Sequence, residues 1–170
     1  MMQSKRIPED LKRKAWEFVN ENDMGKRHSF NGTKEQQYAG VIGENMVRHA
    51  LGYEYSFTPG FDGGYDILHD NTRIDVKTMT RSVDPKPHYA NNFVGYQKDL
   101  PCDVLIFCSI NKRTGILWLC GFTTKLRLLR DGEFFEAGSV RTRDDGTELK
   151  IEAPLYEITN DKLFPLLLFV

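Results

Sequence analysis

Apolar side chains recur at helical spacing near the start of the chain. In residues 8–20, Leu11, Ala15, Phe18 and Val19 form one apolar stripe, which predicts an amphipathic helix. The following residues, up to Gly32, are polar and rich in Gly and Asn, which is typical of a linker or loop.

A second helical stripe is better delimited and spans about 34–51. Thr33 followed by Gln36 is a capping-box pattern, and Gly52 can supply the C-terminal cap. Gly40 and Gly43 each cost roughly 1 kcal/mol of helix propensity. Their position near one face indicates that another segment approaches the helix closely there.

The rest of the chain reads mainly as short strands. Alternating segments at 65–68 and 73–78 flank a turn-rich quartet, and a nearly continuous apolar run at 104–110 predicts a buried strand. Residues 79–100 contain Pro85 and Pro87 and predict a loop with a short helix at 93–99. The elements expected further on are a turn at 111–115, a strand at 116–122, a helix at 124–130 capped by Thr123, one or two more strands and a terminal helix near Asn160.

This order of elements predicts an α/β fold with a mixed central sheet flanked by helices. The 170 residues suit a single domain, and 40% hydrophobic and 28% charged residues are ordinary for a globular protein. The net charge of −1 excludes a grossly basic, histone-like protein but allows a local basic face.

The cysteines and the apolar runs indicate the cellular compartment in which the protein is expected. Cys102, Cys108 and Cys120 are odd in number, lie in apolar stretches and form no C-x-x-C, so neither a disulfide framework nor a structural zinc is expected. The N-terminus lacks the apolar segment of a signal peptide, and the run at 163–170 is too short to cross a bilayer. We therefore expect a cytoplasmic, reducing environment and no membrane.

The hairpin at 65–78 carries the candidate chemistry. A symmetric turn centred on Asp70-Asn71 would pair Asp66 with Asp75 across the strands, and Lys77 would project from the same face. Like charges that face each other destabilise a sheet unless a counter-ion offsets them. A divalent cation would do so, and carboxylate oxygens suit Mg²⁺.

Two alternatives qualify this interpretation. Asp66 and Asp75 could lie on a solvated sheet face where Lys77 simply neutralises them. Asp62, in a glycine-rich turn, competes for the role of Asp66, although it does not pair with Asp75 in the expected register.

The spacing of Asp66 and Asp75-Val76-Lys77 resembles the signature of the PD-(D/E)XK nuclease superfamily. Gly43-Glu44 resembles that family's first acidic motif, and Tyr65 stands where the motif has Pro. The order of elements over residues 34–130 is similar to the family's α-β-β-β-α-β core, so the resemblance implies a restriction-endonuclease-like core.

The resemblance also implies phosphodiester hydrolysis. Asp66, Asp75, the Val76 carbonyl and Glu44 would hold one or two Mg²⁺ ions, for which Mn²⁺ can substitute. The metal would polarise the scissile phosphate and activate a water. Lys77 would act mainly by its charge, because an ammonium beside two carboxylates tends to stay protonated. Glu44 could instead be a solvated helix residue.

Other polar residues are weaker candidates. Gln97 and Lys125 could contact the nucleic acid or simply be exposed. A basic N-terminus could form a phosphate-binding arm or one face of a solvated helix. It comprises Lys5, Arg6, Lys12, Arg13, Lys14, Lys26 and Arg27.

The resemblance thus implies a single-domain, Mg²⁺-dependent deoxyribonuclease of the small stand-alone type that phages often encode. Residues 1–32 would form a helix and linker, 33–130 the catalytic core and 131–170 a C-terminal extension. Three alternatives stay open. One is a Holliday-junction resolvase, whose homodimer the apolar C-terminus could support, and another is a nuclease-fold module that binds nucleic acid or protein without cleaving. The third is an unrelated α/β binding domain in which the motif is accidental.

Overall fold

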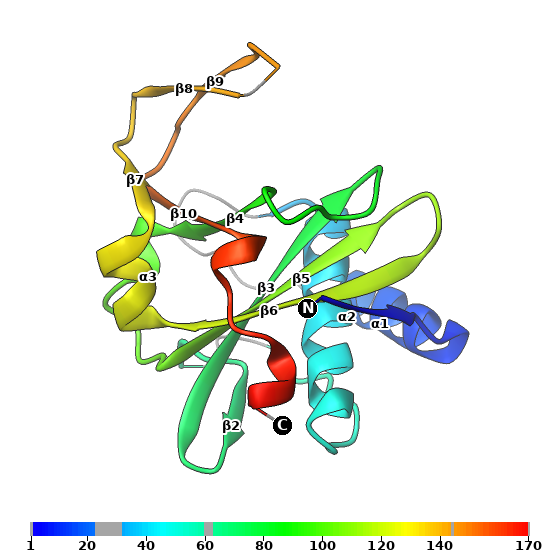
Figure 1. Cartoon of the computed structure of the whole chain (residues 1–170). Helices are drawn as coiled ribbons and strands as arrows, with labels where there is room; N and C mark the ends of the chain where they lie inside the picture. Colours follow the sequence, from blue (N-terminus) through cyan, green and yellow to red (C-terminus); the bar gives the residue numbers. More distant parts are fainter. Residues whose placement is uncertain (1, 23–31, 60–62, 144, 170) are drawn as a thin grey trace.

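The computed structural model describes residues 2–22, 32–59, 63–143 and 145–169 as a mixed α/β protein (Figure 1). The helices are α1 (Glu9–Glu21), α2 (Lys34–Ala50) and α3 (Lys125–Asp131), with single 3₁₀ turns η1 (Gly95–Gln97), η2 (Asn160–Lys162) and η3 (Leu166–Leu168). The strands are β1 (Gln3–Arg6), β2 (Ile67–His69), β3 (Thr72–Arg81), β4 (Ala90–Val94), β5 (Val104–Asn111), β6 (Ile116–Thr124), β7 (Glu133–Phe135), β8 (Val140–Thr142), β9 (Glu148–Lys150) and β10 (Leu155–Thr159).

A five-stranded mixed sheet forms the centre of the molecule, with strand order β1-β6-β5-β3-β2. β3 and β5 are parallel, whereas the other neighbours are antiparallel. All eight residues of β5 are buried, which confirms the buried strand that the apolar run predicts. The expected strand at 116–122 is also confirmed by β6.

Helices α1 and α2 cover one face of this sheet. Leu11, Ala15 and Val19 of α1 are buried, so the apolar stripe that predicted this helix is the face that packs against the core. α2 begins with the predicted capping box, because Thr33 accepts from the Gln36 N–H and the Gln36 side chain accepts from the Thr33 N–H. These helices and the sheet enclose the larger hydrophobic cluster of the described residues.

The other face is covered by a three-stranded sheet, β4-β10-β7, together with α3. The smaller hydrophobic cluster, which includes Phe93, Leu105, Phe107 and Leu128, fills the space between them. α3 is capped by Thr124 rather than by the predicted Thr123. The protein is therefore layered as helices, central sheet, and a second layer of small sheet and helix.

Three regions differ from the sequence prediction. β4 lies within the predicted loop at 79–100, and of the helix expected at 93–99 only the turn η1 forms. Residues near Asn160 form the short turns η2 and η3 in place of a terminal helix, because Pro165 interrupts the segment. The N-terminal region, expected to contain only a helix and a linker, also contains β1, an edge strand of the central sheet that pairs with β6.

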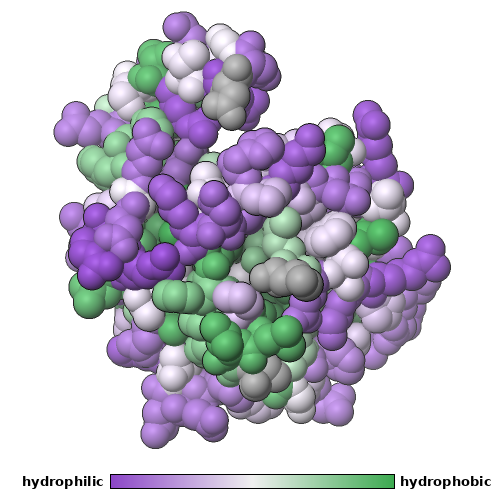
Figure 2. All heavy atoms as spheres, in the orientation of Figure 1, coloured by the Kyte–Doolittle hydropathy of each residue, from purple (hydrophilic) through white to green (hydrophobic). Residues whose placement is uncertain are grey.

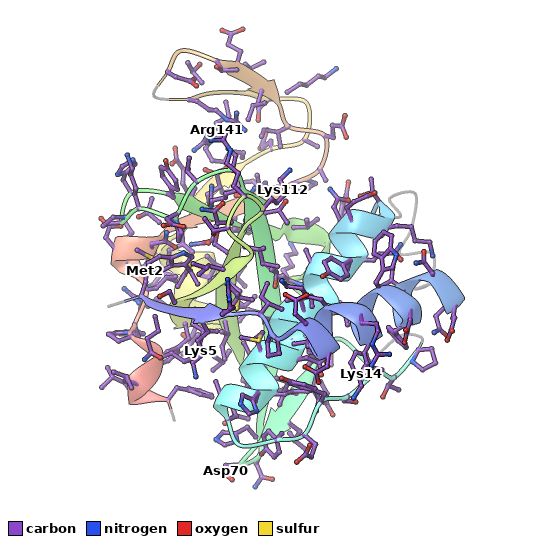
Figure 3. All side chains as sticks on the ribbon, turned by 90° about the vertical axis from the view of Figure 1, so that its right-hand side faces the viewer. Met2, Lys5, Lys14, Asp70, Lys112 and Arg141 are labelled. Atoms are coloured by element: carbon purple, nitrogen blue, oxygen red, sulfur yellow. The ribbon has the colours of Figure 1, made fainter. Side chains whose placement is uncertain are left out.

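The chain between α2 and α3 supplies four strands to the central sheet, β2, β3, β5 and β6, while β4 joins the small sheet. The hairpin β8–β9 stands away from the body, with Arg141 near its base and Asp70 at the opposite end of the molecule (Figure 3). In the part of the chain that the structure describes, no helix is both long and apolar enough to cross a membrane.

Candidate functional site

The β2–β3 hairpin adopts the predicted register from Ile67–Ile74 to the turn, but the pairing ends before the predicted pair of Asp66 with Asp75. Ile67 pairs with Ile74 and Leu68 with Arg73. Asp70 and Asn71 form the turn with φ of 45° and 64°, as a tight hairpin turn with two left-handed residues requires. Asp and Asn tolerate this conformation better than most residues, so the local sequence fixes the alignment of the two strands.

Asp66 lies just before β2, at the point where the two strands separate. Its N–H donates to the Ile74 carbonyl at 2.8 Å, and its Oδ2 accepts from the Val76 N–H at 2.6 Å. The carboxylate of Asp66 therefore contacts the peptide that joins Asp75 to Val76. Because the N–H and C=O of one strand residue point to the same edge, the Val76 carbonyl also faces this side of β3.

Asp75 and Lys77 form an ion pair on β3. Lys77 Nζ lies 2.7 Å from Asp75 Oδ2 and 3.0 Å from Oδ1. The two side chains are only 12% and 18% exposed, so each charged group contacts the other in place of much of its hydrating water. Since Ile74 and Val76 belong to the core that α1 and α2 cover, Asp75 and Lys77 face the opposite, small-sheet side.

Further groups on this side shape the environment of Asp75. Lys77 Nζ lies over the Phe93 ring, 5.9 Å from its centroid. The Cys102 thiol is close enough that burial, followed by the charge of Asp75, raises its pKa to about 11, against the opposing charge of Lys125. Cys102 is thus a neutral thiol at pH 7, and it adds a partly apolar wall beside the ion pair.

Glu44 reaches the same edge of the sheet through Arg48. Arg48 Nε donates to Glu44 Oε1 at 2.8 Å, and Arg48 Nη2 donates to the Asp66 carbonyl at 2.8 Å. Gly43 allows this approach, because a Cβ there would lie 1.8 Å from Thr78 Oγ1 on β3. α2 and Asp75 belong to opposite faces, so Glu44 is linked to the edge beside Asp66 rather than to the face of Asp75.

Oxygen-bearing groups of Asp66, Asp75 and Val76 lie along this part of the hairpin. Carboxylate and carbonyl oxygens from Asp66, Asp75 and Val76 are the ligands that Mg²⁺ prefers. Among the described residues, no three His, Cys, Asp or Glu side chains form a cluster that could hold a metal. Mg²⁺ is commonly held by one or two carboxylates with waters and substrate phosphates, so the residue types at positions 66 and 75 fit such a site.

The remaining sequence candidates occupy different settings. Lys125 Nζ donates to the Leu100 carbonyl at 2.6 Å, so it anchors the segment that leads to Cys102. Gln97 is half-buried on η1. Lys12 and Arg13 form ion pairs with Glu9 and Glu17, as expected of a solvated helix face. Asp62, Lys26 and Arg27 lie outside the described residues.

Sequence reasoning missed Arg48, Phe93 and Cys102 as neighbours of this site. The spacing of Glu44 and Arg48 is that of an i,i+4 ion pair, so this contact was readable from the helix pattern. Phe93 on β4 and Cys102 before β5 approach Asp75 and Lys77 through the tertiary fold. No local sequence pattern predicts such contacts.

Comparison with known proteins does not assign the chain to a family. No protein-family model, curated protein or solved structure matches it. The interpretation of the site therefore rests on the residues and their geometry.

Proposed function

We propose that this protein is a Mg²⁺-dependent nuclease that hydrolyses phosphodiester bonds in DNA and has a restriction-endonuclease-like core. The observation that carries the proposal is the arrangement at the β3 edge. The Asp66 carboxylate contacts the Asp75–Val76 peptide at 2.6 Å, and Lys77 contacts the Asp75 carboxylate at 2.7 Å. The same residues carry the resemblance to the PD-(D/E)XK signature.

Each residue has a defined role in this proposal. Asp66, Asp75 and the Val76 carbonyl would hold the ion, with Mn²⁺ as a substitute, and Glu44 would contribute directly or through water. The bound metal supplies Lewis-acid polarisation of the phosphate and a water of lowered pKa. Lys77 stabilises the negative charge that develops on the phosphate oxygens. Arg48 is a positioning residue, because it holds the Asp66 backbone and Glu44 together.

A second candidate within the same fold is a Holliday-junction resolvase. A four-way junction has two symmetric strands to cut, which calls for a two-fold dimer with one site per subunit. The observation that favours this candidate is apolar surface near the C-terminus, where Leu167 and Leu168 are 68% and 73% exposed. A third candidate is a nuclease-fold module that binds nucleic acid or protein without cleaving.

The first prediction tests the proposed reaction. Incubation with Mg²⁺ or Mn²⁺ and a panel of linear duplex, single strand, nicked circle, flap and four-way junction is expected to give cleavage, which EDTA abolishes. Asp75→Asn and Lys77→Met each remove a charge from the site and are expected to lower the cleavage rate by a factor of about 100 or more.

The matched control is Asp70→Asn, which removes an acid from the exposed turn of the same hairpin and is expected to keep wild-type activity. Circular dichroism of each variant separates lost chemistry from lost folding. Cleavage by Asp75→Asn and Lys77→Met at the wild-type rate contradicts the proposed mechanism. Binding of DNA without metal-dependent cleavage by the wild type favours the non-catalytic module.

A further inference from the structure

Three aromatic side chains are in register across the small sheet. Tyr156 on β10 pairs with Phe93 on β4 and with Phe134 on β7, so all three lie on one face of this sheet. The rings of Phe134 and Tyr156 have centroids 4.8 Å apart. Since Phe93 belongs to the cluster against the central sheet, this face is directed towards the side of β3 that carries Asp75 and Lys77.

The aromatic row runs from the candidate catalytic residues to the surface. Phe93 is 1% exposed and lies under Lys77 Nζ, whereas Phe134 is 47% exposed. Neighbouring strands are about 4.8 Å apart, so two strand steps place Phe134 roughly 10 Å from Phe93. The exposed end of the row is thus within a few nucleotides of a phosphate held at Lys77.

A cavity of about 660 Å³ opens at the exposed end of this row. Phe134 and Tyr156 line one side, and the turn carrying Tyr96, Lys98 and Asp99 lines the other. Tyr96 is 58% exposed, so a second aromatic ring is available to a ligand. Pro154 also contributes to the wall, and the Gly95 N–H donates to its carbonyl at 2.6 Å, which fixes the turn against the small sheet.

The chemistry of this cavity suits a nucleobase. Exposed aromatic rings offer stacking surfaces, and every base has a π face that stacks regardless of sequence. The Lys98 ammonium can pair with a backbone phosphate, and the Asp99 carboxylate can accept from base amino groups. A volume of this size falls in the range of small-molecule sites, which combine apolar walls with a few polar groups.

We propose that this cavity binds an unpaired nucleobase of the substrate strand within a few nucleotides of the phosphate that is cleaved. The inference rests on the proposed function and narrows its substrate to nucleic acid with unpaired nucleotides, such as single strands or flaps. A base within a duplex is already stacked and paired, and its extrusion costs a few kcal/mol. The protein therefore binds a single strand more tightly than a blunt duplex of the same length.

The test measures binding without cleavage. Fluorescence anisotropy in EDTA compares a labelled oligodeoxyuridylate, an oligouridylate and a blunt DNA duplex as ligands of the full chain. Phe134→Ala and Tyr96→Ala each remove an exposed stacking ring and are expected to raise the Kd for the single strand about tenfold. Phe134→Trp, which keeps a ring, is expected to retain wild-type affinity.

The matched control is Leu126→Ala, which removes an apolar side chain that is 78% exposed on α3 and is expected to change nothing. The two single-stranded ligands decide between DNA and RNA as the bound strand. Equal Kd values for wild type, Phe134→Ala and Tyr96→Ala overturn the inference, as does wild-type binding to duplex that equals or exceeds binding to both single strands. If binding depends on the aromatic residues but no metal condition gives cleavage, the proposed reaction fails while the cavity assignment stands.

Discussion

Gly43 on α2 packs closely against Thr78 on β3, next to the candidate site. A Cβ at position 43 would lie 1.8 Å from Thr78 Oγ1 and 3.0 Å from Thr78 Cβ. Such a separation is far below normal contact, so the helix or the strand would have to move. Gly43 therefore sets how closely α2 can carry Glu44 and Arg48 to the β3 edge.

The close packing of α2 against β3 predicts opposite changes in the free energy of unfolding when two glycines of α2 are replaced by alanine. Gly40→Ala is expected to raise the free energy of unfolding by up to about 1 kcal/mol, because alanine favours the helix and no atom lies within 4 Å of its new methyl group. Gly43→Ala is expected to lower the free energy of unfolding by about 1–3 kcal/mol, because it overpacks the interface. Urea unfolding of both variants measures the difference, and stabilisation by Gly43→Ala would contradict the packing described here.

The residues of the candidate site divide into local ones, which the hairpin pattern could predict, and distant ones, of which only Glu44 was predicted, through the family resemblance. Asp66, Asp75 and Lys77 share one hairpin, so strand alternation and the Asp70-Asn71 turn suffice to bring them together. The cross-strand pairing nevertheless stops at Ile67 and Ile74, and Asp66 contacts a backbone N–H at the strand edge. That detail depends on where the strands separate, which alternation does not encode.

Among the elements, the parallel pair β3 and β5 is joined at its start by Arg73 and Asp103. Arg73 Nε and Nη2 donate to the two Asp103 oxygens at 2.9 and 2.7 Å, and the Arg73 N–H donates to Oδ2 at 2.9 Å. These bonds, the Arg73 side chain first, lower the pKa of Asp103 to about 2. Because the folded pKa lies below the usual value of about 3.9, the ionised carboxylate stabilises the fold above pH 4.

The stabilisation by Asp103 is expected to be lost as the pH falls from about 4 to 2. Asp103→Asn removes this titration, so its urea midpoint is expected to be lower than that of the wild type at pH 7 and to fall less steeply between pH 4 and 2. Tryptophan fluorescence during urea titration at several pH values measures both. The Asp70→Asn turn variant is the control, and an unchanged pH slope in Asp103→Asn would show that this pair does not couple folding to pH.

The elements that the sequence did not predict are those that depend on distant partners. β4 was assigned to a loop because prolines precede it, yet it pairs with β10, more than sixty residues later. The expected terminal helix is absent from the described residues at that position, because Pro165 divides the segment and Phe164 forms a bridge with Phe122 on β6. The helices α1, α2 and α3 and the β2–β3 hairpin were predictable because their signals lie within a few residues.

At the scale of the whole molecule, the C-terminal segment leaves apolar surface uncovered. Leu166 is buried against the core, whereas Phe164, Leu167 and Leu168 are 40%, 68% and 73% exposed. Figure 2 shows apolar atoms gathered over the C-terminal segment, on a surface that is otherwise largely hydrophilic. Contiguous exposed apolar surface of this kind is characteristic of protein interfaces, and burying it against a second copy would remove it from water.

The final prediction follows from this surface and bears on the resolvase alternative. If two chains associate through Leu167 and Leu168, the double variant Leu167→Gln, Leu168→Gln is expected to shift the sedimentation coefficient from dimer to monomer. The unfolding midpoint of the dissociated chain should change little, because neither side chain is buried within it. Leu126→Gln, on α3, is the control for an exposed leucine elsewhere. A wild type that sediments as a monomer contradicts the proposed dimer. It also contradicts the resolvase alternative, because paired cleavage of a junction requires two-fold symmetry. The nuclease with a single site per molecule would then be the function to test.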